Sequence, residues 1–183
     1  MEGEQGVFGK PYNRPETKME GHVEADETFV GGKGKSGGPT AGGKKAIVFT
    51  LVDRDGDARS FHVDEMTGAH LQGIIARNAE GGATISTDEN RSYIGLRELY
   101  DHGAVKHGAG EYVRGTVHTN FAESFFSLLK RGILGVFHHV SKRHLLRYLE
   151  EFDFRWTRRK MTAQERMREA IRGADGMRLM YRA

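Results

Sequence analysis

Residues 46–65 read AIVFTLVDRDGDARSFHVDE. The first part, AIVFTLVD (46–53), is continuously apolar, as a strand covered on both faces is expected to be. ARSFHVDE (58–65) can follow as an antiparallel partner. The turn between them (54–57) contains an Asp-Gly pair, which supplies the positive φ that a tight hairpin needs. The stretch therefore predicts a buried β-hairpin.

The residues before this hairpin predict a third strand and two irregular segments. HVEADETFV (22–30) alternates apolar and polar residues, which is typical of a strand. With the hairpin it forms a three-stranded antiparallel meander. Residues 1–20 are polar and are expected to form a flexible N-terminal arm. Glycines dominate 31–45, which predicts a mobile loop carrying four lysines: Lys33, Lys35, Lys44 and Lys45.

A helix and a strand are expected after the hairpin. Thr67 is a suitable N-cap, and apolar residues at helical spacing follow it until Gly81-Gly82 ends the helix. ATIST (83–87) then predicts a strand that stops at Asp88. Residues 90–100 are expected to be helical, and AVKH (104–107) to form a further short strand.

The chain is expected to be almost entirely helical from about Thr119 onward. Strands and helices in this order predict an α/β fold: a mixed sheet, made of the antiparallel meander plus parallel strands, with a helical C-terminal region. The expected domains are the arm (1–20), one catalytic domain (21–160) and a C-terminal helical tail (161–183).

Composition narrows the classes of function. The 183 residues include no cysteine, which excludes disulfides, thiolate zinc sites and a cysteine nucleophile. No apolar run approaches the roughly 20 residues of a membrane span, and no signal peptide is visible, so a cytoplasmic protein without a membrane partner is expected. Residues 1–129 hold 14 basic against 19 acidic residues, and residues 130–183 hold 14 against 6. A basic part beside an acidic part favours a polyanion partner near a carboxylate site, although an Arg-rich solvated face fits the same charges.

Two aspartates lie on predicted strands, and one of them is at the end where sheets commonly place ligands. Asp26 is in the middle of the strand at 22–30, and Asp88 ends the strand at 83–87. Ligands bind at the carboxyl ends of strands in open α/β sheets. Asp88 can alternatively act as the cap of the helix that follows it.

The segment VHTNFAESFFSLLKRGILG (117–135) predicts an amphipathic helix with one polar face. Asn120, Glu123 and Lys130 share that face, as expected for a helix that lines an active site. A local explanation also exists, because Glu123 can act as a capping-box residue if Thr119 or Asn120 is the N-cap.

The three carboxylates Asp26, Asp88 and Glu123 suit a site for two divalent ions. Mg²⁺ prefers oxygen ligands and keeps several waters, so one or two carboxylates for each ion suffice. Two such ions about 4 Å apart can serve phosphodiester displacement. The His138-His139 pair does not predict a zinc site, because no metal-binding pattern accompanies it.

The segment SKRHLLRYLEEFDFRWTRRK (141–160) predicts a second amphipathic helix, N-capped by Ser141. Its basic residues can follow a DNA backbone, although they also fit a solvated helical face. The end of the preceding predicted helix contributes two more basic residues. The candidate DNA-binding residues are Lys130, Arg131, Lys142, Arg143, Arg147, Arg158 and Arg159.

Three stretches resemble one family in order and spacing: VEADETFVGGK (23–33), STDENRSYIGL (86–96) and 110–159, which includes HTNFAESF. They are similar to the insertion-sequence transposases of the ISXO2-like group, which are DDE-type recombinases with a ribonuclease H-like core. The similarity runs from about Gly21 to Arg159.

The resemblance implies a role for each acid. Asp26 matches the first catalytic aspartate, Asp88 the second, and Glu123, 35 positions after Asp88, the third acid. Lys130 matches the basic residue of the family's signature, and Asn120 is a second candidate for the third metal-site position. The implied cofactor is Mg²⁺, with Mn²⁺ as a substitute and two ions bound, and no zinc is expected in this chain.

The implied partner is double-stranded DNA, both element ends and target, bound by a homo-oligomer that is nucleoid-associated when on DNA. Members of the group usually carry an N-terminal zinc ribbon and helix-turn-helix, and neither is present in these residues. Two alternatives therefore stay open. One is a truncated, non-catalytic remnant that binds DNA or a full-length transposase, and the other is a structure-selective nuclease on the same fold.

Overall fold

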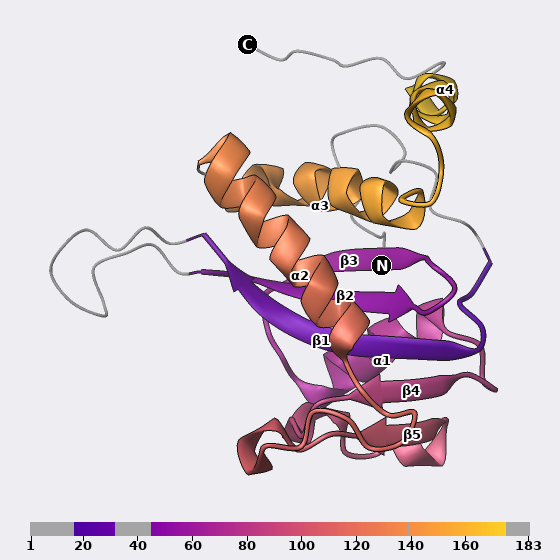
Figure 1. Cartoon of the computed structure of the whole chain (residues 1–183). Helices are drawn as coiled ribbons and strands as arrows, with labels where there is room; N and C mark the ends of the chain where they lie inside the picture. The colour runs from indigo at the N-terminus through magenta and orange to yellow at the C-terminus, as the bar shows by residue number, and fades with distance from the viewer. Residues whose placement is uncertain (1–16, 32–44, 139, 175–183) are drawn as a thin grey trace, which may run out of the picture.

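The computed structural model describes residues 17–31, 45–138 and 140–174 and is built around one five-stranded mixed sheet (Figure 1). The strand order is β3-β2-β1-β4-β5. β1 pairs antiparallel with β2, as does β2 with β3, whereas β4 runs parallel to both β1 and β5. The mixed sheet predicted from the sequence is thus confirmed. Its strands are β1 (His22–Val30), β2 (Ala46–Asp53), β3 (Ala58–Val63), β4 (Thr84–Thr87) and β5 (Asp101–Ala104).

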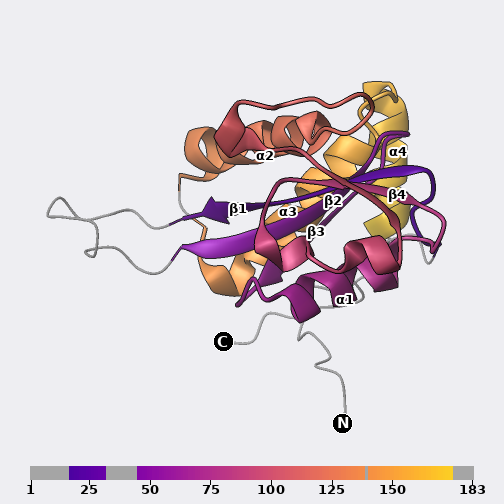
Figure 2. The ribbon, with the colours of Figure 1, turned by 90° about the horizontal axis from the view of Figure 1, so that it is seen from below.

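Helices cover both faces of this sheet, as Figure 2 shows in a view along the layers. One face carries α1 (Gly68–Asn78). The other carries α2 and α3, and α4 lies farther from the sheet (Figure 1). Their bounds are α2 (Asn120–Gly132), the π-helical turn η4 (Ile133–Phe137), α3 (Lys142–Thr157) and α4 (Ala163–Ala174).

Alternation along β1 divides its side chains between two cores. Val23 and Ala25 belong to the core under α1. Val30 belongs to the core under α2 and α3. Because neighbouring residues of a strand point to opposite faces, Glu24 and Asp26 share the face of Val30. β1 therefore presents Glu24 and Asp26 to the layer of α2 and α3.

Three expectations for the middle of the chain need correction. α1 ends at Asn78, before the glycine pair that was expected to stop it. Residues 90–100 form two short 3₁₀ turns, η1 (Arg91–Tyr93) and η2 (Leu96–Glu98), in place of one helix. The last strand covers 101–104, not 104–107. Pairing with β4 imposes a strand on the polar residues DHGA, whose composition does not predict one.

The described N-terminal residues extend the packed domain. Met19 is buried and bridges to Ala79, its N–H donating to the carbonyl of Asn78 over 2.7 Å. The last residues assigned to the arm are therefore packed, whereas 1–16 lie outside the described residues, as do 175–183 of the tail. The lysine-bearing loop, apart from Gly31 and Lys45, also lies outside them. In the part of the chain that is described, no helix is long and apolar enough to cross a membrane.

Candidate active site

Asp26 and Asp88 belong to neighbouring parts of the sheet, on β1 and directly after β4. Glu24 pairs with Ser86 across the parallel β1–β4 ladder. The ladder ends at this pair, and Asp26 and Asp88 each follow two residues later along the chain. Asp26 lies on the face covered by α2 because side chains of a strand alternate with a period of two residues.

The pKa of Asp26 reflects its burial and the carboxylates near it. Burial raises its pKa to about 7 from 3.8, against an opposing hydrogen bond from the Glu27 N–H to Oδ1 over 2.8 Å. Repulsion from the carboxylates of Glu27, Asp88 and Glu123 adds to the increase. Asp26 is therefore within electrostatic range of both other predicted ligands.

Asp88 is not the cap of a helix. Its Oδ1 accepts the N–H of Asn90 over 3.0 Å, and Asn90 itself caps η1 through a hydrogen bond from the N–H of Ser92. Burial raises the pKa of Asp88, and the nearby His107 ring opposes that increase. The capping explanation for Asp88 is therefore wrong.

Glu123 lies on the first turn of α2, where the structure does not favour the capping-box explanation. The N-cap is Thr119, whose side chain makes no capping hydrogen bond. Glu123 is then the fourth helical residue, one beyond the position a capping box requires. Its side chain is 50% exposed, and Oε1 lies 3.8 Å from Nε2 of His107. Asn120, the first residue of the helix, is also exposed.

Glu24 is a functional candidate that the sequence reasoning missed. Its side chain is fully buried, and Oε2 accepts the backbone N–H groups of Phe121 and Ala122 over 2.8 and 3.2 Å. The other oxygen lies 3.1 Å from Nε of Arg54 and 2.9 Å from Nδ1 of His118, the latter without the alignment of a hydrogen bond. Its spacing of two residues from Asp26 was the available signal.

Glu27 holds the segment that follows Asp88. It accepts hydrogen bonds from the hydroxyl of Tyr93 and, over 2.5 Å, from Nδ2 of Asn90. Burial raises the pKa of Glu27. The hydrogen bonds from Tyr93 and Asn90 oppose that increase, and the carboxylate of Asp88 adds to it. The two glutamates that flank Asp26 thus connect β1 to the segments that carry Asp88 and Glu123.

His107 is the second residue that was missed. Its Nε2 lies 3.3 Å from Oγ1 of Thr119, and its ring packs edge-on against Tyr112 with centroids 5.2 Å apart. It lies beside Glu123 and within electrostatic range of Asp88. No local sequence pattern marked it, because it lies in a 3₁₀ turn, η3 (His107–Ala109).

The donor chemistry of the three acids fits a hard divalent cation. In the described ranges, none of these acids (Asp26, Asp88 and Glu123) forms an ion pair with a lysine or arginine. Carboxylate oxygens are the ligands that Mg²⁺ prefers. However, among those same residues no three His, Asp or Glu side chains stand close enough to bind one ion together.

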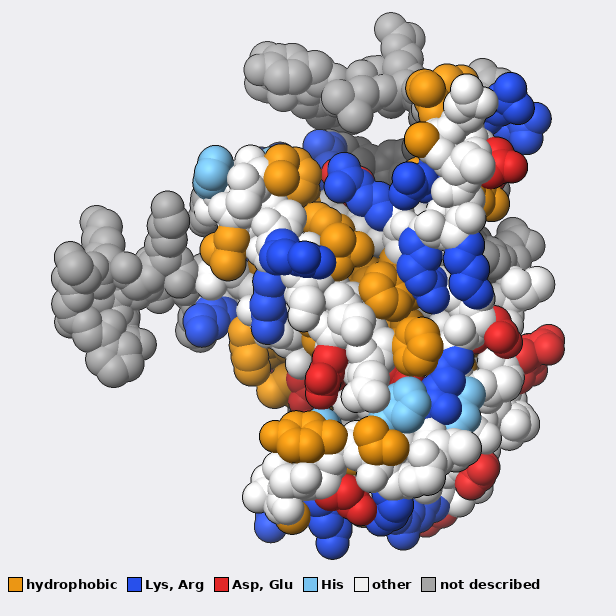
Figure 3. Space-filling model, viewed as in Figure 1, with side chains coloured by type: hydrophobic (Ala, Val, Ile, Leu, Met, Phe, Trp, Pro, Cys, Tyr) orange, Lys and Arg blue, Asp and Glu red, His pale blue; other side chains and the backbone are white. Residues whose placement is uncertain are grey.

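The candidate DNA-binding residues fall into two groups. Lys130 and Arg131, at the end of α2, are exposed, as are Lys142, Arg143 and Arg147 of α3. Figure 3 shows basic side chains over the face formed by these helices.

The second group, Arg158 and Arg159, has partners within the chain. Arg158 lies 3.4 Å from Glu169 and stacks over Phe154. Arg159 donates to the carbonyl of Gly56 over 2.9 Å and stacks over Trp156. Both are partly buried, so their positions indicate a structural contribution.

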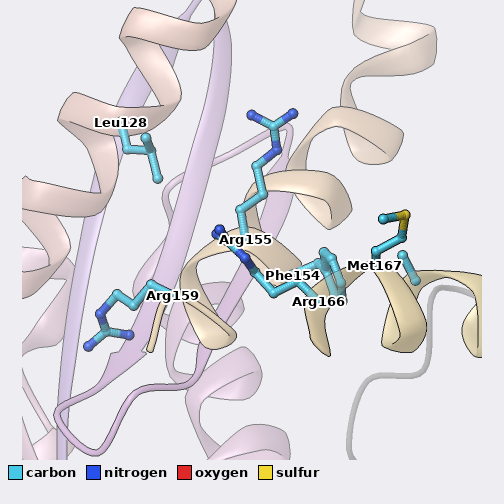
Figure 4. Close-up of a pocket in the computed structure, with 7 residues that line it drawn as sticks. Leu128, Phe154, Arg155, Arg159, Arg166 and Met167 are labelled. Carbon is cyan, nitrogen blue, oxygen red and sulfur yellow. The ribbon is translucent and has the colours of Figure 1, made fainter. Parts of the chain in front are cut away.

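A groove of about 560 Å³ lies between α2, α3 and α4 (Figure 4). None of the three acids lines it, so it is separate from the candidate active site. The lining side chains are Leu128, Phe154, Arg155, Arg159, Arg166, Met167 and Ala170.

Comparison with known proteins agrees with this architecture. Residues 18–157 match the family model described as the ISXO2-like transposase domain. The chain is also 33% identical over 166 residues to a Halobacterium salinarum protein described as an uncharacterized protein in transposable element ISH50. That alignment covers 81% of this chain and 56% of the relative, so the chain spans little more than half of the relative's length. A mixed five-stranded sheet with helices on both faces fits a ribonuclease H-like transposase domain. The chain belongs to the family of ISXO2-like transposase domains.

Proposed function

We propose that this chain is the metal-dependent catalytic core of a DDE-type DNA transposase, which cleaves phosphodiesters at the ends of an insertion sequence and transfers the strands. Asp26, Asp88 and Glu123 would hold two Mg²⁺ ions, for which Mn²⁺ could substitute. The observation that carries this proposal is the position of Asp26 on β1, where its partly buried carboxylate lies within electrostatic range of both other acids. Neighbouring carboxylates that form no ion pair with lysine or arginine suit a cation.

The residues of the proposed site have different roles. Bound Mg²⁺ supplies charge stabilisation and activates the attacking oxygen. Asp26, on β1, and Asp88, directly after β4, come from neighbouring segments of the sheet and form the first part of the site. Glu123, exposed on the first turn of α2, closes it by a side-chain rotation, and Asn120 is the second candidate for that position.

DNA binding is assigned to the basic face of α2 and α3. Lys130 lies seven residues after Glu123, two turns along the same face of α2, where a lysine can hold a phosphate without displacing a metal ion. Arg131, Lys142, Arg143 and Arg147 extend this exposed face. Such contacts position double-stranded DNA without reading its sequence. We further propose that the protein acts on DNA as a homo-oligomer.

One observation favours a second candidate function, a non-catalytic remnant that binds DNA or a full-length transposase. Within the described residues the acids do not close around one ion. A remnant of this kind would bind DNA through the same basic face and would not respond to divalent cations. A structure-selective nuclease would cleave DNA but would not join the new 3′ end to a target.

The test is DNA cleavage and strand transfer by the full chain with Mg²⁺ or Mn²⁺. Asp88→Asn removes a proposed ligand, and Asp64→Asn, an exposed aspartate after β3, is the matched control. We expect metal-dependent activity in the wild type and in Asp64→Asn, and its loss in Asp88→Asn. Equal activity in all three proteins would refute the assignment, and cleavage without joining would indicate the nuclease.

A further inference from the structure

We propose that Glu24 is a positioning residue, which sets the start of α2 on β1 and so the separation between Asp26 and Glu123. This inference rests on the proposed function, because it concerns the geometry of the same metal site. Glu24 is not a ligand in this proposal. It acts through the helix that carries the third acid.

The first observation is that Glu24, a residue of β1, caps the N-terminus of α2 in place of a residue next to the helix. The first N–H groups of a helix have no partner inside it. Here two of them, those of Phe121 and Ala122, donate to Oε2 of Glu24 over 2.8 and 3.2 Å, while the side chain of the N-cap Thr119 accepts no capping hydrogen bond. In the described part of the chain, these are the hydrogen bonds that join α2 to β1.

The second observation is that Arg54 and His118 contact the other carboxylate oxygen of Glu24, Oε1. A fully buried carboxylate is costly unless charged and polar partners surround it. Nε of Arg54 lies 3.1 Å and Nδ1 of His118 2.9 Å from Oε1. Arg54 also donates to the carbonyl of Thr116 over 2.6 Å, which fixes the segment leading into α2. Glu24 therefore has one favoured position.

The third observation is the spacing of these contacts from the site. Asp26 follows Glu24 by two residues on the same face of β1, and Glu123 directly follows Ala122. A sliding or turning movement of the first turn of α2 changes the Asp26–Glu123 separation directly. The negative charge also faces the helix N-terminus, where an anion is stabilised by the helix dipole.

The experiment measures Mn²⁺ binding without DNA, together with thermal unfolding, in the full chain. Glu24→Gln keeps the size of the side chain but removes its charge and one acceptor oxygen. Val48→Ala is the matched control, because Val48 is fully buried in the core under α2 and α3 and contributes packing alone. Asp88→Asn serves as the reference for a lost ligand.

We expect both Glu24→Gln and Val48→Ala to unfold at lower temperature. The half-saturating Mn²⁺ concentration should rise about tenfold or more in Glu24→Gln, as for other residues that orient metal ligands, and should not change in Val48→Ala. If Glu24→Gln does not fold, Glu24→Asp replaces it, because it keeps the charge but is too short to reach both N–H groups. An intermediate loss of Mn²⁺ affinity is then expected.

The outcomes separate the two proposals. Wild-type affinity in the Glu24 variant, with weaker binding in Asp88→Asn, overturns the positioning role and leaves the proposed function intact. Equal Mn²⁺ binding in the wild type and Asp88→Asn overturns the proposed function and this inference with it.

Discussion

Nε2 of His107 lies 3.8 Å from Oε1 of Glu123. Thr119 and Tyr112 hold the imidazole ring in this position, and the ring is also close enough to Asp88 to oppose the increase in the pKa of that aspartate. The ring is partly exposed, so it can contact a ligand that approaches the acids. A DNA phosphate bound at the acids would therefore meet a ring nitrogen.

We predict that His107→Gln slows DNA cleavage about tenfold, which corresponds to the loss of one charge-assisted hydrogen bond of about 1.4 kcal/mol. Mn²⁺ binding should stay as strong as in the wild type, because His107 is not a proposed ligand. Single-turnover cleavage and Mn²⁺ titration check both parts. A loss of Mn²⁺ affinity in the variant would show that His107 belongs to the metal site.

The raised pKa of Asp26 predicts how stability depends on pH without metal. Between 3.8 and about 7 the folded protein retains a proton that the unfolded chain has lost. The free energy of unfolding should therefore fall as pH rises through this window, by about 2–4 kcal/mol. Urea unfolding in the presence of a chelator measures it, with Asp26→Asn as the control that lacks this titration. Identical pH dependence in both proteins would contradict the burial of an ionisable Asp26.

Lys130 is expected to bind phosphate. Lys130→Ala should weaken DNA binding several-fold and lower the slope of log affinity against log salt by about 1. The melting temperature should not change, because the side chain is exposed. Filter binding over a range of salt concentrations checks this. An unfolded Lys130→Ala variant would instead identify the lysine as a structural residue.

Gly132 allows α2 and α3 to approach closely. A Cβ at this position would overlap the ring of Phe152, whereas a Cβ on Gly135 would meet nothing within 4 Å. Gly132→Ala should therefore lower the free energy of unfolding by about 1–3 kcal/mol through overpacking. Gly135→Ala is the matched control, and chemical unfolding of both variants is the measurement. Equal stability of the two variants would contradict this packing of α2 on α3.

Periodicity was sufficient for the sheet that carries the two aspartates. The alternation of HVEADETFV and the apolar run 46–53 predicted the antiparallel meander, and the strand at 83–87 was predicted to stop at Asp88. The polar face of α2 also followed from helical spacing. These features depend on the residues of one segment at a time, so a single sequence contains them.

The parts that were missed depend on contacts between distant segments. Glu24 reads as an ordinary exposed residue of a strand until α2, almost 100 residues later, begins directly over it. His107 reads as part of a strand because the actual strand, Asp101–Ala104, has a polar sequence and forms only through pairing with β4. Tertiary contacts override local preference at both places.

The proposed function requires that Asp26, Asp88 and Glu123 surround the same metal ions. Fe²⁺ binds oxygen sites at least as tightly as Mn²⁺, and with ascorbate and peroxide it cuts a polypeptide next to the place where it is bound. The fragments of the wild-type chain should then end near residues 26, 88 and 123. Excess Mg²⁺ and the Asp88→Asn substitution should both suppress them. Cuts near 26 and 88 without one near 123 would contradict the claim, because Glu123 would then lie outside the site.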